Sequence, residues 1–577
     1  MRRHWLCLPL FTCLASLATA ETPLRIERLW RCGDVLDARH PHFCLSVRGM
    51  SEAPLTLRLN GQNVAIDRQG QHVQFDVQPG LQHSGPLLLG QGGQLSNPVW
   101  LSLAGNHVLA AGPGETALNM DGLSTAVSLV GVIIEERFEG LAQARELAHK
   151  YGASVVGAIP ALNLYQLRLP AHDLTERDAL VLRLGSELSV DAVVIDESPA
   201  VEQGPAQPHQ APLADEWAAN RFADAVNYYR RRIPARGAPL DTTAIKVGVI
   251  ERGVDFDSPD FAEYLGDCQL PRTCVYARDA RQASEHGSSV TGVLAAHWQK
   301  GGNTGLLRGL DGASKGFEVI VDRDSDAGVL ANVAASVNLV EDGVRVLNWS
   351  WGLHRVGAQT VQGTDVDTQV HSGLAMSGYE ELLEEFFRWL RQKHPDVVVI
   401  NSAGNGSSHA GTDEYRLPSS FITEQLLVVG GHQRADAPGT AVTAPGYAMK
   451  RSSSNIDLRV DITAAACTHG ASAASGEEGA VHCGTSFATP LVAGTVAAML
   501  SINPALTPEQ LRMLLRRSAL PIGSNYDFEP MDAEDLTAPI LPSERNDDLN
   551  HPDVGRSARL DIQKALDLAV QSRDRRR

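Results

Sequence analysis

After its first 20 residues, this chain of 577 residues has no apolar run long enough to cross a membrane. A spanning helix needs roughly 18 consecutive apolar residues, so we expect no membrane span. Clustered Lys and Arg are scarce too: the one dense basic group is the tail 573–577, and the formal net charge is -18. Because phosphate recognition needs clustered positive charge, the composition argues against a nucleic-acid binder. Nothing in the sequence specifies an oligomeric state.

Cysteine is also scarce, and no Cys-x-x-Cys pair occurs anywhere. Residues 1–20 have a basic start, an apolar middle and the small residues Ala18-Thr19-Ala20, a pattern typical of a signal peptide. We therefore expect export, to the periplasm or out of the cell. Cleavage would remove Cys7 and Cys13 and leave six cysteines of the eight.

The six remaining cysteines form three couples that are local in sequence. In an exported protein the default is disulfide formation, and a structural zinc site is the competing interpretation. The absence of Cys-x-x-Cys favours the disulfides, and the simplest pairing is Cys32–Cys44, Cys268–Cys274 and Cys467–Cys483.

The pattern of residues changes several times along the chain and predicts several domains. Residues 21–125 show short alternating runs broken by Asn-Gly and Pro-Gly, typical of an accessory antiparallel β domain without a legible function. Residues 126–201 read strand, helix, strand, helix, strand, which a ferredoxin-like α+β unit explains. Residues 202–240, rich in Pro, Ala, Gln and Arg, are interpreted as a linker.

From residue 241 to 570 apolar strand-like runs alternate with helix-like segments, and residues 571–577 form a basic tail. This alternation predicts an α/β fold with a largely parallel sheet and helices on both faces. The first run, "IKVGVI", is followed by four acids: Glu251, Asp255, Asp257 and Asp260. Because ligands and catalytic groups gather at the carboxyl ends of parallel strands, the question is which of these acids carries chemistry.

Three further stretches carry polar residues of a catalytic kind. Ser486 in "CGTSFATP" stands at the start of an apolar helix, where free backbone N–H groups can hold an anion. His286 opens "HGSSVTG", and Asn405 ends the strand "VVVINSAGN". Each has an ordinary structural explanation: a helix cap, a lone structural His, an Asn in a turn. The order carboxylate, His, Asn, Ser in one α/β unit is not well explained by chance.

These stretches resemble the subtilisin-like serine peptidases (subtilases) over about 330 residues, and "GTSFATP" is a highly specific marker of that family. The order acid, His, Ser is the subtilisin order, and Ser486 lacks the Gly-x-Ser-x-Gly elbow of the α/β-hydrolases. The resemblance implies that Ser486 is the nucleophile, His286 the general base and Asn405 a donor to the oxyanion. Glu251 stands where the family has its catalytic Asp, and Asp255 matches a second, non-catalytic acid.

The resemblance also implies a substrate and a maturation path. Two segments match the backbone that pairs with an extended polypeptide substrate and lines its first pocket: Ser350, Trp351 and Gly352, and Ser402, Ala403 and Gly404. Ferredoxin-like propeptides precede many subtilases, so residues 126–201 are expected to act as a propeptide-type partner of the catalytic domain.

The predicted function is therefore an exported serine endopeptidase, made as a zymogen that processes itself. The alternative is a catalytically inactive subtilase-fold protein that binds peptides or a surface, suggested by Glu251 in place of Asp. We expect no cofactor and no metal in the site. Calcium is conceivable at the loop acids Asp365, Asp367 and Asp547, but they lack a recognisable ligand spacing.

Overall fold

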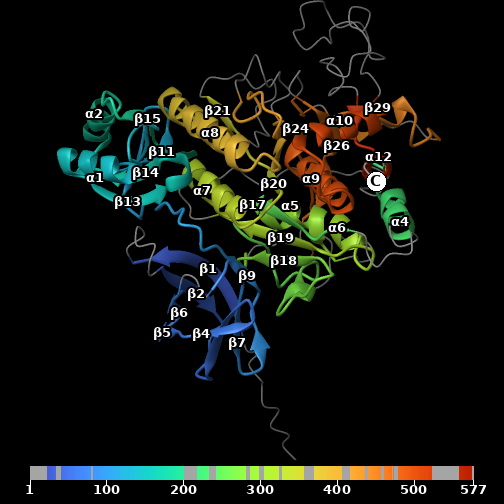
Figure 1. Cartoon of the computed structure of the whole chain (residues 1–577), viewed down its shortest axis with the longest axis horizontal. Coiled ribbons are helices and arrows are strands. Elements are labelled where there is room, and N and C mark those ends of the chain that lie inside the picture. Colours follow the sequence, from blue (N-terminus) through green and yellow to red (C-terminus); the bar gives the residue numbers. More distant parts are fainter. Residues whose placement is uncertain are drawn as a thin grey trace, which may run out of the picture.

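The computed structural model comprises three packed units (Figure 1). The structure describes residues 22–33, 41–78, 82–199, 217–232, 242–280, 286–297, 305–323, 328–355, 369–405, 416–435, 439–451, 453–455, 460–470, 472, 479–522 and 558–574. The predicted signal peptide and the acids Asp365, Asp367 and Asp547 lie outside these residues.

The amino-terminal unit consists of two antiparallel sheets that share one apolar core. Their alternating sequences bury every second side chain, which is the pattern expected where only one face of a strand meets the core. The first sheet is ordered β1-β2-β6-β5: Arg25–Cys32, His42–Arg48, His72–Asp76 and Asp67–Gln69. The second is ordered β4-β3-β7-β8, with β9 also on β7: Gln62–Val64, Leu55–Leu59, Gly85–Gln91, Gln94–Leu95 and Val99–Leu101.

The second unit has the ferredoxin-like element order and an antiparallel sheet ordered β13-β14-β12-β15. The helix Gly140–Tyr151 ends at Gly152, which adopts the left-handed conformation. The helix Leu174–Leu184 begins after Asp173, whose side chain caps it. In chain order the elements of the unit are β12 Leu129–Ile134, α1 Gly140–Tyr151, β13 Ser154–Ile159, η1 Pro160–Leu162, β14 Leu164–Arg168, α2 Leu174–Leu184 and β15 Val190–Val194. A small sheet beside it comprises β10 Thr116–Leu118, β11 Leu123–Ala126 and β16 Glu197–Pro199.

The largest unit is built on a ten-stranded, mainly parallel sheet ordered β18-β19-β17-β20-β23-β24-β26-β30-β29, with β25 antiparallel on β24. Successive residues of its strands face opposite cores, as Val398 and Val399 do, so both faces are covered. The strands are β17 Ile245–Ile250, β18 Cys274–Ala277, β19 Phe317–Asp322, β20 Val346–Trp349, β23 Val398–Ser402, β24 Leu426–Arg434, β25 Ala448–Lys450, β26 Ile462–Ala465, β29 Leu520–Pro521 and β30 Ala558–Arg559.

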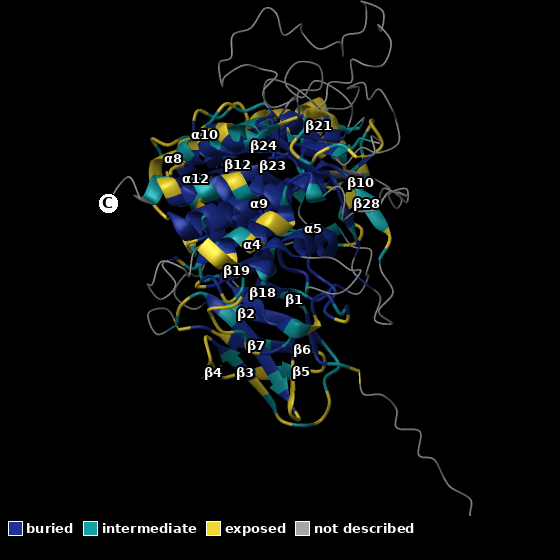
Figure 2. Ribbon diagram, turned by 90° about the vertical axis from the view of Figure 1, so that its right-hand side faces the viewer, coloured by how far each residue is buried: buried dark blue, intermediate teal, exposed yellow. Residues whose placement is uncertain are grey.

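The helices lie in two layers, one on each face of this sheet (Figures 1 and 2). One layer holds α7 Gly328–Glu341 and α8 Gly373–Lys393. The other holds α4 Phe222–Arg232, α5 His286–Ala295, α6 Leu306–Gly309, α9 Thr485–Ile502, α10 Pro508–Ser518 and α12 Ile562–Asp574. Short pieces complete the unit: β21 Leu353–Arg355, β22 Gln369–His371, β27 Cys467–His469, β28 Val481–Cys483, η3 Ala262–Tyr264 and η4 Pro445–Tyr447.

Helix α9 is, within the described residues, the one helix long and apolar enough to cross a membrane. All of it is buried inside the protein, beneath the central strands, so it serves as a core helix.

Helix α4 lies within the range predicted to be a linker, and it packs into the main core. Phe222, Ala225, Val226 and Tyr229 form its buried face, and the hydroxyl of Tyr229 lies 2.7 Å from that of Ser501 on α9. This segment is therefore part of the α/β unit. Its apolar residues recur at helical spacing, which is the signal that separates it from a connector.

The amino-terminal unit of two antiparallel sheets, called the β unit below, covers the edge strand β18 of the large sheet. The side chain of Asn97 donates to the carbonyl oxygens of Ala277 (2.8 Å) and Ile26 (3.0 Å), and Ala277 N–H donates to Pro98 O at 2.9 Å. Exposed sheet edges invite pairing with other chains, so this contact occupies one.

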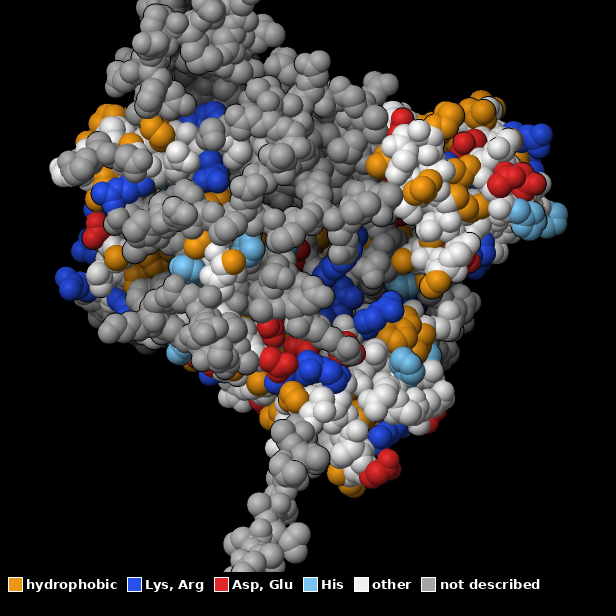
Figure 3. Space-filling view, turned by 180° about the vertical axis from the view of Figure 1, so that it is seen from behind, with side chains coloured by type: hydrophobic (Ala, Val, Ile, Leu, Met, Phe, Trp, Pro, Cys, Tyr) orange, Lys and Arg blue, Asp and Glu red, His pale blue; other side chains and the backbone are white. Residues whose placement is uncertain are grey.

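On the described part of the face seen in Figure 3, acidic and basic side chains are mixed.

The sheet of the ferredoxin-like unit packs against α7 and α8, and two adjacent acids fix that contact. Asp196 accepts hydrogen bonds from the backbone N–H groups of Val329 and Leu330 at the start of α7. Glu197 accepts from the backbone and hydroxyl of Ser372, the N-cap of α8, both at 2.8 Å. Carboxylates at helix N-termini are stabilising because they satisfy unpaired N–H donors.

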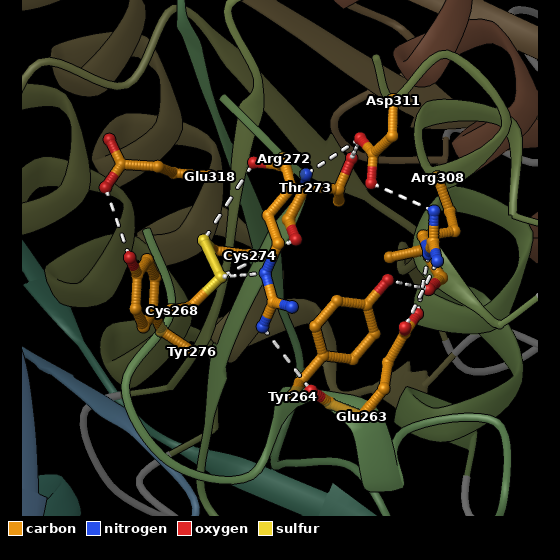
Figure 4. Close-up of a disulfide and its surroundings, with 11 residues drawn as sticks. Glu263, Tyr264, Cys268, Arg272, Thr273, Cys274, Tyr276, Arg308, Asp311 and Glu318 are labelled. Carbon is orange, nitrogen blue, oxygen red and sulfur yellow. Dashed lines mark hydrogen bonds and ion pairs between the residues drawn. A yellow bond between two sulfur atoms is a disulfide. The ribbon is translucent and has the colours of Figure 1, made fainter. Parts of the chain in front are cut away.

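All three predicted disulfides are present: Cys32–Cys44, Cys268–Cys274 and Cys467–Cys483. The sulfurs of Cys32 and Cys44 lie near His42, but they are bonded to each other, which is the disulfide arrangement and not the zinc one. Figure 4 shows the Cys268–Cys274 bridge, with the ion pairs of Arg308 to Glu263 and Asp311 close by.

Candidate active site

One of the four acids that follow strand β17 lies against a predicted site residue, His286. An oxygen of the Glu251 carboxylate, Oε1, lies 2.8 Å from Nδ1 of His286, the first residue of α5. Gly287 makes the close approach possible, because a Cβ on it would lie 2.4 Å from the carbonyl oxygen of Gly253 and 3.3 Å from Cβ of Glu251. Because Gly287 has no side chain, the start of α5 packs against the end of β17, and His286 lies beside Glu251.

The other three acids have different partners. Asp255 accepts from the backbone N–H of Asp257 at 2.9 Å, and burial raises the pKa of its carboxyl. Asp257 pairs with Arg25 of the β unit at 3.0 Å. Asp260 accepts from the backbone N–H of Ser472 at 2.8 Å. These contacts tie the three acids to loops and to the amino-terminal unit, whereas Glu251 contacts His286.

Ser486 is the second residue of α9 and is fully buried. Its hydroxyl donates to the carbonyl oxygen of Ser350 at 3.2 Å, while the Ser350 hydroxyl donates to the carbonyl oxygen of Ser486 at 2.8 Å. Ser350 directly follows β20, so this reciprocal pair fastens the start of α9 to the carboxyl end of a central strand.

Asn405 lies beside the same helix start. Its side-chain oxygen accepts from the backbone N–H of Thr485 at 2.8 Å, and the Thr485 hydroxyl accepts from the N–H of Gly404 at 3.1 Å. These two contacts place the Asn405 amide next to the N-terminus of α9. A helix N-terminus carries a partial positive charge, an environment that stabilises a developing anion.

Helices α5 and α9 bring His286 and Ser486 to the same region. Gly494 lets the helices pack closely, since a Cβ on it would lie 3.1 Å from Leu294. At their N-terminal ends the rings of His286 and Phe487 are 5.4 Å apart. Glu251, His286, Ser486 and Asn405 are distant in sequence, but they thus gather near the carboxyl ends of the central strands.

A second histidine, which sequence reasoning missed, lies near the first. The ring of His482 on β28 is 6.3 Å from that of Phe487, and burial together with the positive charge of His286 lowers the pKa of His482. The Cys467–Cys483 disulfide joins the two strands of this hairpin. The position of His482, two residues before "GTS", is the signal that could have drawn attention to it.

The two predicted substrate segments follow neighbouring parallel strands, β20 and β23. The side-chain amide of Asn401 bridges them, donating to the carbonyl oxygens of Trp349 (2.9 Å) and Trp351 (2.8 Å). Between the segments lies the buried side chain of Arg416, also missed from sequence. A single Arg before "LPSS" is a weak signal, because arginines are common in loops.

Residues 242–555, more than half of the chain, match the model of the subtilase family, Peptidase_S8. The chain therefore belongs to the subtilase family, and this membership supports serine endopeptidase activity.

Curated relatives include subtilisin NAT of Bacillus subtilis subsp. natto, 25% identical over 361 residues that cover 62% of this chain and 82% of the relative. Fervidolysin of Fervidobacterium pennivorans is 28% identical, with 49% of this chain and 38% of the relative covered. The crystal structure of the epidermin leader peptide processing serine protease from Staphylococcus aureus matches with a TM-score of 0.47 and 16% identity, covering 77% of this chain and 98% of that one.

Proposed function

We propose that this protein is an exported serine endopeptidase in which Ser486 is the nucleophile, His286 the general base and Glu251 the carboxylate that orients it. The single observation that carries the proposal is the 2.8 Å contact between Glu251 and Nδ1 of His286. A carboxylate on Nδ1 holds that nitrogen as the donor and leaves Nε2 as the proton acceptor. The same contact stabilises the imidazolium formed during the reaction.

The chemistry proceeds as amide hydrolysis requires. When a substrate binds, the Ser486 hydroxyl leaves the carbonyl of Ser350 and attacks the scissile carbonyl carbon, while His286 accepts its proton. His286 then delivers that proton to the departing amine, leaving an acyl-enzyme that water hydrolyses by the same steps. The backbone N–H of Ser486 and the amide of Asn405 donate to the oxyanion, and losing one such donor typically costs roughly 10²–10³ in turnover.

The substrate class is polypeptide. Backbone groups of Ser350, Trp351 and Gly352, and of Ser402, Ala403 and Gly404, would pair with an extended chain as an added strand does. Such pairing binds the main chain whatever its sequence. The adjoining strands β21 and β22 extend the first segment.

The ferredoxin-like unit is proposed to be the propeptide. Asp196 and Glu197 hold it on α7 and α8, and β16, its last described strand, packs beside β22. Strand β22 in turn pairs with β21, which directly follows the first substrate segment. The next residues, 200–216, are proposed to carry the self-processing site, because α4 downstream is embedded in the core; they lie outside the described residues. The predicted signal peptide supports export, and one relative is named an extracellular protease, of Xanthomonas campestris pv. campestris.

A fluorophosphonate probe tests the proposal against an inactive peptide-binding protein. The probe should label the purified parent at Ser486, and peptide mapping should find the label there. Ser486→Ala, the matched control, should remain folded and unlabelled. A folded parent that neither reacts with the probe nor hydrolyses casein would establish the binding alternative.

A further inference from the structure

The side chain of Arg416 lies in the space between the two proposed substrate segments. A Cβ added to Gly352 would lie 2.1 Å from Cζ of Arg416, and one added to Gly404 would lie 2.8 Å from its Nε. Gly404 has φ of +100°, a conformation that favours glycine. The guanidinium is thus in contact with the backbone of both segments, in the place where the first pocket of an extended substrate would lie.

Hydrogen bonds fix the guanidinium there. Nη1 donates to the side-chain oxygens of Asn401 (3.2 Å) and Ser419 (2.5 Å) and to the carbonyl oxygen of Ser402. Nη2 donates to the Ser402 hydroxyl at 3.0 Å. Arg416 is fully buried, with 0% of its surface exposed.

The backbone next to Arg416 is fixed as well. Leu417 exchanges two backbone hydrogen bonds with Leu353 on β21, at 2.9 and 3.0 Å. This bridge joins the Arg416 segment to the strand that follows Gly352. The side chain therefore has little freedom to swing out of the space it fills.

We propose that Arg416 fills the first pocket and restricts the residue before the cleaved bond to small side chains such as Gly, Ala or Ser. This inference rests on the proposed endopeptidase function and adds a specificity-determining residue to it. Volume is the physical cause: a large side chain can enter only if the guanidinium leaves.

Displacing the guanidinium has a further cost. The acceptors on Asn401, Ser402 and Ser419 would lose a charged donor inside the protein, and losing a hydrogen bond to a charged group in the interior is unfavourable. A substrate with Ala before the cleaved bond avoids both penalties. We therefore expect discrimination on the order of 10²-fold in kcat/KM between Ala and Phe, the scale at which pockets distinguish side chains by size.

The test compares fluorogenic peptides that differ only in the residue before the cleaved bond: Ala, Ser, Leu, Phe, Glu and Lys. Three full-length enzymes are used: the parent, Arg416→Ala, which empties the pocket, and Arg416→Met, which keeps a long side chain without the charge. Filling of the pocket predicts that the parent and Arg416→Met prefer Ala over Phe. Arg416→Ala should raise kcat/KM for Phe relative to Ala by roughly 10- to 100-fold.

Two results would overturn the inference. The first is a parent that hydrolyses the Phe peptide as well as the Ala peptide, a result that needs no variant to fold. The second is a parent that prefers Glu, with the preference lost in Arg416→Met, since the charge and not the volume would then select the substrate. Fluorophosphonate labelling distinguishes failure of the inference from failure of the proposed function. A labelled parent that hydrolyses the Ala and Phe peptides equally refutes only the inference. An unlabelled parent refutes the proposed function and the inference with it.

Discussion

The carboxylate of Glu251 lies 2.8 Å from Nδ1 of His286, and Asp255, four residues further along, is bonded to the backbone of its own loop. The position next to the imidazole is therefore occupied by a glutamate. Cβ of Glu251 lies against Gly287, where a side chain would not fit. The first prediction concerns this pair.

Glu251→Gln should lower kcat by about 10⁴, the loss known for the corresponding Asp-to-Asn change in a Ser-His-Asp triad, because the amide cannot stabilise the imidazolium and can hold the wrong tautomer. Glu251→Asp should lose roughly tenfold, since a shortened acid misplaces the contact in a site built around Glu. Steady-state kinetics on a peptide substrate measure both.

Asp255→Asn is the matched control, because it removes a nearby charge without touching His286. We expect its kcat to stay within a few-fold of the parent. If Glu251→Gln kept near-full activity while a folded Asp255→Asn lost it, Asp255 would be the orienting acid.

The second prediction concerns maturation. The purified precursor should cut itself in the predicted linker 202–240, and more narrowly before Trp217, because α4 downstream is packed against α9 and α12. Ser486→Ala should leave the precursor intact. Intact-mass analysis and amino-terminal sequencing of the product locate the cut. Unchanged processing of Ser486→Ala would assign the cut to another protease.

The third prediction concerns the Cys467–Cys483 disulfide, which closes a loop with a sequence separation of 16 directly before α9. In the chain-entropy model such a bridge stabilises by about 3 kcal/mol. The double change Cys467→Ser, Cys483→Ser, made in Ser486→Ala to prevent self-cleavage, should lower the free energy of unfolding by that order. Non-reducing peptide mapping should find the bridge in the parent, and two free thiols there would contradict it.

The fourth prediction is a pH dependence from Asp196. Burial raises its pKa from 3.8 to about 7, against the N–H groups of Leu330 and Val329 and the positive charge of Arg323, which lower it. A raised pKa means that folding favours the protonated acid. Its contribution to stability is thus full below the unfolded pKa near 4 and is lost as the pH rises through 7.

Urea unfolding of the Ser486→Ala precursor at pH 4.5 to 8 measures this contribution as a difference from Asp196→Asn. The free energy of unfolding of the parent should fall by a few kcal/mol more than that of the variant across this range. Other buried acids titrate equally in both proteins and cancel. Parallel curves would show that the helix α7 contacts keep Asp196 ionised at low pH.

The fifth prediction concerns Glu197, which joins the ferredoxin-like unit to the N-cap of α8 through Ser372. Glu197→Ala should destabilise the Ser486→Ala precursor by about 1–2 kcal/mol, the scale of a lost helix-cap interaction. Glu187→Ala, on the far side of the unit beside Lys150, is the control, because surface pairs contribute little. Equal effects of the two changes would argue against a special role of Glu197.

Much of the fold could be predicted from local pattern alone. Apolar runs such as residues 245–250 and 398–402 form strands because strands buried on both faces need continuous hydrophobicity. The element order between residues 126 and 201 predicted a ferredoxin-like unit. The short separations between cysteines in the sequence predicted the three disulfide pairs. The stretch "GTSFATP" identified the family, because its residues are contiguous in sequence and together form the start of one helix.

The remaining features depend on which surfaces meet, and tertiary structure alone decided them. The resemblance pointed to Glu251 among the four acids after β17, but its contact with Nδ1 of His286 depends on the packing of α5 through Gly287. The sequence offered an Arg in a loop, and the spacing of two strand ends placed Arg416 between Gly352 and Gly404. Contacts between residues distant in sequence arise from the close packing of whole elements, where a single methylene changes the fit, and no local pattern records that fit.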